Sequence, residues 1–195
     1  MEPVPRPEWS SPIEGGVHAR SFYSALPEQP TREVLQALRA DPKLLGCLER
    51  HRLGRLEFSG RVPDVRWLGS YHPSSGEMVV NAFRSPETYG KKFDPPELIS
   101  VSAAGRDLTE AMQRSLYHEL GHKIIDIAGP EALHQVESLR RSGRAMPISV
   151  RARDAGPQEY FSESFAAYRF EGSFADKDPE GYHMVEEILR LAWRK

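Results

Sequence analysis

Apolar residues in the second half of the chain recur at helical spacing. From residue 108 onward an apolar side chain returns at every fourth position, which places these side chains along one face of a helix. They are Leu108, Met112, Leu116, Leu120 and Ile124. Asp107 can cap this helix at its start, and Gly129-Pro130 is a common stop signal. The pattern therefore predicts a long helix with one buried face.

Further helices are predicted before and after this long helix in the sequence. Capping residues and prolines of the first turn mark their starts, and apolar residues at helical spacing fill them. The first begins at Thr31, a second follows Asp41-Pro42, and three more cover residues 131–141, 157–171 and 178–191. The second half of the chain is therefore expected to be entirely helical.

Alternating apolar and polar residues between these helices predict strands. The alternation covers Leu56 and Phe58, then Val65 and Trp67, then Met78 to Phe83 after a turn at Pro73–Gly76, and finally Leu98 to Val101. We interpret these segments as a β-meander. Short helices, then strands, then helices indicate an α+β fold rather than alternating β-α-β units.

The chain has 195 residues, a length typical of one domain. Residues 1–30 are rich in Pro, Glu, Ser and Gly, and such a composition buries too little apolar surface to fold by itself. We therefore expect a flexible leader over residues 1–30 and a single domain over residues 31–195.

Composition and charge exclude several classes of partner. The net charge of −2 gives no reason to expect nucleic acid, which needs a clustered positive surface. A local basic cluster does exist, and its simplest interpretation is a solvated helix end. It consists of Arg140, Arg141, Arg144, Arg151 and Arg153. With Cys47 as the one cysteine, neither an intramolecular disulfide nor a cysteine-based zinc site is expected.

No apolar run approaches the roughly 20 residues of a membrane span, so no membrane partner is expected. The first residues lack the apolar segment of a secretory signal. We therefore expect a protein that is cytoplasmic at synthesis, with export by a signal-independent route left open. We also expect it to be a monomer.

The segment HELGH at 118–122 carries the strongest chemical signal. His118 and His122 are four positions apart, so on a helix they lie one turn apart on the same face. Two imidazoles placed in this way can reach one zinc ion. Glu119 lies beside them and can act as the general base of a zinc-dependent hydrolase. The expected cofactor is therefore Zn²⁺.

A catalytic zinc site needs a third protein ligand. Asp126 lies on the same helix as the histidines, a poor position for a third ligand, although it could orient a histidine. Glu159 and Glu163 share one face of a later predicted helix whose other face is aromatic. We expect Glu159 to be the ligand and Glu163 to support a ligating histidine from the second shell. In that arrangement a Glu159 oxygen and both His Nε2 atoms meet within about 2.3 Å of one metal position.

HELGH at 118–122 and EYFSESF at 159–165 together resemble the gluzincin metallopeptidases of the anthrax lethal factor-like group, which includes the small bacterial Pro-Pro endopeptidases. The resemblance covers roughly residues 50 to 175. It implies a zincin-like fold and the same roles for the ligands, the base Glu119 and Glu163. It also implies that residues 77–83 form an edge strand, along which an extended peptide substrate pairs.

The chain departs from this family at one position. The family commonly has a Tyr about seven residues before the ligand Glu, directed at the developing oxyanion, and Ala152 stands there in this chain. Arg151 or Arg153 could replace that Tyr as the catalytic donor. Tyr168, Tyr182 and His183 are the alternatives.

The leading hypothesis is a zinc endopeptidase that hydrolyses a specific protein or an extended peptide. One competing hypothesis is an intracellular regulatory protease of the HExxH type. Another is a catalytically degenerate zincin that acts as a binding or inhibitory module, which the missing Tyr favours slightly. An intact Glu119 argues against the degenerate form, because a site without catalysis has no use for a general base.

Overall fold

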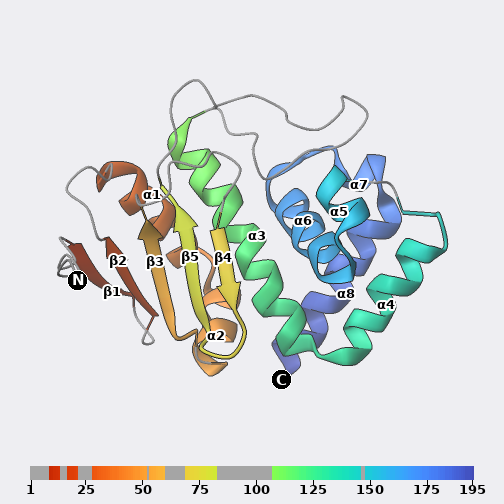
Figure 1. Ribbon diagram of the computed structural model, residues 1–195, viewed down its shortest axis with the longest axis horizontal. Helices are drawn as coiled ribbons and strands as arrows, with labels where there is room; N and C mark the ends of the chain where they lie inside the picture. Colours follow the sequence, from red (N-terminus) through yellow and green to blue (C-terminus); the bar gives the residue numbers. More distant parts are fainter. Residues whose placement is uncertain are drawn as a thin grey trace, which may run out of the picture.

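Helix α3, Leu108–Ala128, runs through the middle of the molecule, with a β-sheet on one side and the C-terminal helices on the other (Figure 1). The computed structural model describes residues 9–13, 17–21, 28–51, 53–59, 69–82, 107–145 and 148–195. Over these residues the chain has the α+β organisation that the sequence predicts, because the strands precede α3 and the second half is helical.

In the described part of the chain the sheet has five strands, in the order β1-β2-β3-β5-β4. Their bounds are β1 Trp9–Ile13, β2 Val17–Ser21, β3 Arg55–Ser59, β4 Gly69–His72 and β5 Glu77–Asn81. The outer pairs β1/β2 and β4/β5 are antiparallel, whereas β2/β3 and β3/β5 are parallel. The sheet is therefore mixed, and the predicted β-meander is wrong. Alternation tells which side chains face the core, but not which strand lies beside which.

The position of β5 also corrects an expectation about the substrate strand. β5 pairs with β3 along one edge and with β4 along the other, so residues 77–81 are not an edge strand. Phe83 lies outside the described residues. Among the described strands β4 is the terminal one at this end of the sheet, and it packs beside α3.

Strands β1 and β2 lie within the segment where the sequence analysis expected a leader. Proline is tolerated at the edge of a sheet, where its missing N–H leaves no ladder bond unmade. β1 is such an edge strand, and Pro12 lies within it, opposite His18. The proline content therefore hid a strand. The division into a leader and one domain stays a prediction.

Helices α1 and α2 lie on the same side of α3 as the sheet, and helices α4 to α8 lie on the other side (Figure 1). Their bounds are α1 Glu28–Arg39, α2 Pro42–Arg50, α4 Pro130–Arg141, α5 Val150–Asp154, α6 Pro157–Phe170, α7 Phe174–Lys177 and α8 Pro179–Arg194. All the predicted helices are present, whereas the short α5 and α7 were not foreseen. The predicted strands at 65–67 and 98–101 lie outside the described residues. In the described part of the chain, no helix has the length and apolarity needed to cross a bilayer.

Helix α3 begins at the predicted cap, where the Asp107 carboxylate accepts a hydrogen bond of 2.9 Å from the backbone N–H of Glu110. Of the predicted apolar stripe, Met112, Leu116, Leu120 and Ile124 are fully buried and Leu108 is partly buried. Because α3 contacts β4 and β5 as well as α6 and α8, its polar face is covered too. The HELGH segment therefore lies in the interior of the protein.

Candidate metal centre and adjoining cleft

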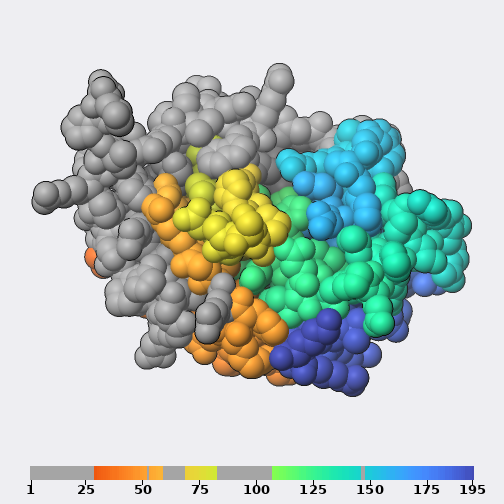
Figure 2. Space-filling model, turned by 60° about the horizontal axis from the view of Figure 1, so that its bottom comes forward, coloured from red at the N-terminus to blue at the C-terminus, as the bar shows by residue number. Residues whose placement is uncertain are grey.

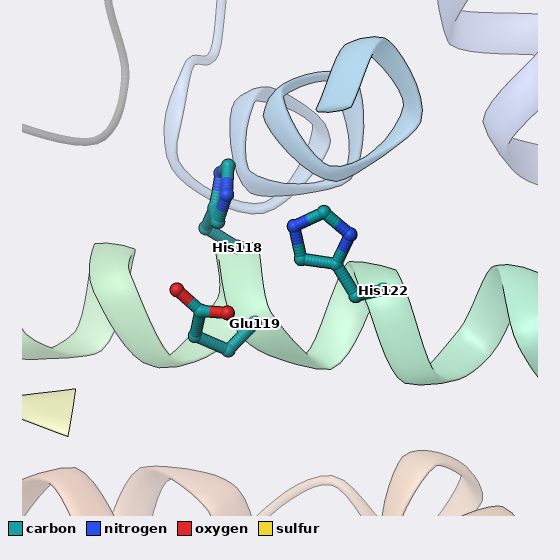
Figure 3. Close-up of side chains that lie close together, drawn as sticks. All are labelled: His118, Glu119 and His122. Carbon is teal, nitrogen blue, oxygen red and sulfur yellow. The ribbon is translucent and has the colours of Figure 1, made fainter. Parts of the chain in front are cut away.

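His118 and His122 both point from α3 toward α6, as Figure 3 shows. Their ring centroids are 5.0 Å apart, and Glu119 lies between them in sequence with its carboxylate directed to one side. These three residues offer ligand atoms that lie within 4.8 Å of one another. The group could therefore hold a metal ion, in agreement with the sequence motif.

The glycine of HELGH has a packing role that the sequence analysis did not identify. A Cβ added to Gly121 would lie 2.7 Å from the Cα atom of Ser162 on α6. Real side chains do not come so close to a backbone atom, so a glycine is required for this approach of the two helices. The close approach brings the acidic face of α6 over the two histidines.

Glu159, in the first turn of α6, lies near both histidines. Its Oε2 is 3.3 Å from His118 Nε2, and its Oε1 is 3.6 Å from His122 Nε2. In a tetrahedral zinc site with bonds of about 2.0–2.1 Å, neighbouring ligand atoms are about 3.3–3.4 Å apart. The observed separations are close to this value. Each imidazole lies near a different oxygen of Glu159, so this carboxylate is within reach of a cation shared by the two histidines.

Glu163 lies one turn further along α6 and is fully buried. Its Oε1 is 3.1 Å from His118 Nδ1, on the opposite side of the ring from Glu159. A buried carboxylate is costly unless a positive group compensates it. A protonated His118 ring, or a cation bound to that ring, would supply that compensation, and the carboxylate in turn fixes the ring orientation.

The two histidines have opposite pKa shifts in this arrangement. Burial lowers the pKa of His118, but the neighbouring carboxylates of Glu159 and Glu163 outweigh burial and raise the pKa to about 10. Burial and the neighbouring His118 lower the pKa of His122 to about 4. Burial raises the pKa of Glu159, whereas hydrogen bonds from His118 and Arg151 outweigh it and lower the pKa to about 2. Glu159 is therefore ionised near neutral pH, as a ligand must be.

Glu119 is nearly buried, with 4% of its surface exposed. Burial raises the pKa of its carboxyl group to about 7, although His118 acts in the opposite direction. The edge strand β4 approaches this carboxylate closely. A Cβ added to Gly69 would lie 2.6 Å from the backbone oxygen of Val79 and 2.8 Å from Glu119 Oε1, so a glycine is required at this position. Glu119 is therefore held between α3 and the sheet edge.

A cleft of about 330 Å³ opens beside this group. β4 forms one wall, α3 the floor, and the segment with α5 and the start of α6 the other wall. In Figure 2 these parts are the yellow, green and light-blue atoms that meet on one face. Glu119, His122 and Glu159 all line the cleft, so solvent or a ligand can reach the candidate centre.

Tyr71 and Asp126 both line this cleft and contact each other. The Tyr71 side chain on β4 is hydrogen-bonded to Asp126 on α3, and together with burial this raises the pKa of the Tyr71 phenol. The ammonium group of Lys123 lies 5.9 Å from the centre of the Tyr71 ring. Asp126 was expected to orient a histidine, and the structure places it against Tyr71 instead. The sequence analysis did not identify Tyr71, because only the tertiary pairing of β4 with α3 brings it here.

The two arginines proposed for the oxyanion lie in different places. Arg151 lines the cleft and donates hydrogen bonds to both oxygens of Glu159, at 2.8 and 2.7 Å. Arg153 pairs with Asp154 at 2.7 Å and lines another cavity. Ala152 between them is buried. The structure therefore brings Arg151 to the site and directs Arg153 away from it.

The remaining alternatives for the oxyanion do not line the cleft. Tyr168 and Tyr182 contact each other, with ring centroids 4.8 Å apart. His183 is exposed and lies 3.4 Å from Glu186 on the same helix. Of the side chains considered for the oxyanion, Arg151 is therefore the one that the described structure places at the centre.

A scan against known protein families finds no matching family, and a search of curated proteins finds no similar chain. The residues of the site therefore have to carry the functional argument.

Proposed function

We propose that this protein is a zinc-dependent endopeptidase, with His118, His122 and Glu159 as metal ligands and Glu119 as the general base. One observation carries the proposal: Glu159, from a separate helix, lies 3.3 and 3.6 Å from the two histidines. Two imidazoles and one carboxylate form a common ligand set of catalytic zinc, which leaves a fourth position open to water or substrate.

The resemblance to the lethal factor-like gluzincins supports a peptidase over other zinc hydrolases. It rests on HELGH at 118–122 and EYFSESF at 159–165. The distances of Glu159 and Glu163 from the histidines agree with the roles that this resemblance implies for the two carboxylates.

A zinc ion held by His118, His122 and Glu159 would supply Lewis acidity, which would polarise a scissile carbonyl and make a bound water more acidic. The Glu119 carboxylate takes the proton from that water and can return it to the leaving amine. Glu163 keeps the His118 ring oriented. The Arg151 guanidinium is the candidate donor to the developing oxyanion.

The substrate in this proposal is a protein or an extended peptide, and β4 replaces residues 77–83 as the strand along which it pairs. An edge strand offers unpaired N–H and C=O groups to an added strand. Gly69, Ser70 and Tyr71 of β4 line the cleft, so a peptide paired there would pass Glu119 and the metal position.

The test combines zinc content with peptide cleavage. Elemental analysis of wild type, Glu159→Ala and the control Glu131→Ala, an exposed position on α4, measures zinc per chain. A mixed peptide library is then incubated with wild type and with Glu119→Gln. We expect about one zinc per chain in wild type and control, weaker binding in Glu159→Ala, and cleavage by wild type alone.

The other outcomes are equally informative. Zinc binding without cleavage of the library or of any protein substrate would favour the binding module. A wild-type protein without zinc affinity would overturn the proposal.

A further inference from the structure

The basic cluster of the sequence folds around a second cavity, separate from the cleft. This cavity, of about 290 Å³, is formed by α4, the segment after it, α5 and the start of α6. We call it the arginine cavity; its lining is Glu137, Arg140, Arg141, Ala145, Arg153 and Tyr160. Three guanidinium groups line this cavity with one carboxylate, Glu137, and a second carboxylate, Asp154, pairs with Arg153, in a protein whose net charge is −2. The positive charge is local to this cavity.

Hydrogen bonds hold part of this cluster in place. The Glu137 carboxylate accepts bonds of 2.9 Å from Arg140 Nη1 and 2.7 Å from Arg141 Nε. Arg140 Nη2 also donates to the backbone oxygen of Arg153 at 2.9 Å, which ties α4 to the end of α5. Arg140 is therefore a fixed part of the wall rather than a solvated side chain.

The other two arginines lie at the rim. The side chains of Arg141 and Arg153 are 79% and 56% exposed, so each pairs with its carboxylate in contact with solvent. A guanidinium has five N–H donors, and one carboxylate cannot use them all. The rim can therefore bind a further carboxylate, in the bidentate geometry that arginine favours.

The arginine cavity is close to the catalytic cleft, because α5 forms part of both. Arg151 lines the cleft and Arg153 lines the cavity, two positions further along the same short helix. Their Cα atoms are therefore only about 5–6 Å apart. An extended peptide spans about 3.3 Å per residue, and a helix with its side chains is about 10–12 Å across. A peptide that leaves the cleft and crosses α5 would therefore reach the cavity within about three to five residues.

We propose that the arginine cavity is a secondary binding site for acidic side chains of the peptide substrate. It selects peptides with Asp or Glu about three to five residues from the scissile bond. Ala145, Tyr160 and the arginine stems give the site an apolar floor beneath the charged rim. The distance to the scissile bond rests on the proposed function, because it assumes that the protein cleaves peptides. Binding of an acidic peptide at the arginine cavity does not need that assumption.

Peptide binding tests the proposal without cleavage. A short glutamate-rich peptide with a neutral fluorescent label is titrated with zinc-loaded Glu119→Gln protein, and its glutamine analogue serves as the uncharged probe. Adding Arg141→Gln and Arg153→Gln is expected to weaken binding of the glutamate peptide about tenfold and to leave the glutamine peptide unchanged.

A matched pair of substitutions controls for net charge. Arg190→Gln with Arg194→Gln removes the same charge from exposed positions of α8. This control is expected to bind both peptides as the parent protein does. Equal losses in both double variants, or no loss in Arg141→Gln/Arg153→Gln, would overturn the secondary site.

Cleavage kinetics then separate the two proposals. If wild type cleaves peptides, Arg141→Gln/Arg153→Gln should raise KM for acidic substrates and leave KM for their amide analogues unchanged. If the protein binds no zinc but still binds acidic peptides through Arg141 and Arg153, the peptidase proposal is refuted and the arginine cavity remains a binding site. Cleavage with no arginine-dependent preference for acidic peptides would refute the site and keep the peptidase.

Discussion

Arg151 holds both carboxylate oxygens of Glu159, through hydrogen bonds of 2.8 Å from Nε and 2.7 Å from Nη2. The pair links α5 to the first turn of α6. Each carboxylate oxygen has two lone pairs, so the guanidinium fork leaves one on each oxygen for another partner. His118 and His122 lie near those same oxygens. The pair thus restrains the carboxylate in an orientation that serves a metal.

Arg151→Gln should therefore weaken zinc binding by about tenfold or more, as loss of a residue that orients a ligand does in other zinc sites. Zinc affinity is measured by competition with a chelator. Arg153→Gln, on the same helix but outside the cleft, is the control and should bind zinc as wild type does. Tighter zinc binding by Arg151→Gln would instead mean that the guanidinium competes with the metal for Glu159.

Glu163→Gln tests the second carboxylate without changing the size of the side chain. Glu163 Oε1 lies 3.1 Å from His118 Nδ1, so the neutral amide should hold the imidazole less strongly. We expect a loss of about 10–100-fold in zinc affinity. Zinc affinity equal to that of wild type would show that Glu163 does not act through His118.

Thermal unfolding of metal-free Glu163→Gln is the companion measurement. If the variant unfolds far below wild type without zinc, its affinity loss reflects damage to the fold. Similar unfolding temperatures assign the loss to the orientation of His118.

Gly121→Ala should destabilise the protein, although alanine is the better helix former. In an exposed helix this change stabilises by up to about 1 kcal/mol. Here the new Cβ would lie 2.7 Å from the Cα atom of Ser162, and overpacking of this kind costs about 1–3 kcal/mol. The free energy of unfolding, measured in denaturant, is therefore expected to fall.

Gly46→Ala in α2 is the control for Gly121→Ala. The nearest atom to its new Cβ would be Arg50 Nη1, at 3.8 Å, an ordinary contact. We expect this variant to be as stable as wild type or slightly more so. If both variants are stabilised, α3 and α6 can move apart without loss of stability, and Gly121 is not required for the close approach of these two helices.

The sequence predicted the parts of the site that are local to one helix. Residue spacing places His118 and His122 on one face of α3, and the same reasoning placed Glu159 and Glu163 on one face of α6. That the two faces meet was inferred from the ligand number of zinc and from a family resemblance. The distances of Glu159 from both histidines agree with that inference.

The parts that depend on tertiary neighbours were not predictable in this way. Strand alternation identified β3 and β5 but could not give the parallel pairing between them. Arg151 and Arg153 looked equivalent in sequence, because the five-residue helix α5, which directs them to different cavities, has no distinct pattern. Tyr71 had no local signal, since its role depends on the position of β4 beside α3.

Gly69→Ala addresses the contact between β4 and Glu119, the proposed general base. The new Cβ would lie 2.8 Å from Glu119 Oε1 and 2.6 Å from the backbone oxygen of Val79, so the carboxylate or the strand must move. His118, His122 and Glu159 are not among the nearest contacts of this Cβ. We therefore expect kcat to fall by about tenfold or more while zinc affinity stays close to that of wild type.

Gly54→Ala is the control, because its Cβ would also collide with backbone, 2.4 Å from the Ser75 oxygen, but beside the turn before β5. Both variants should lose stability, since each disturbs the sheet. Only Gly69→Ala should lose turnover once the measurements are made well below its unfolding temperature. An equal loss of kcat in both variants would mean that general strain in the sheet, rather than the position of Glu119, limits catalysis.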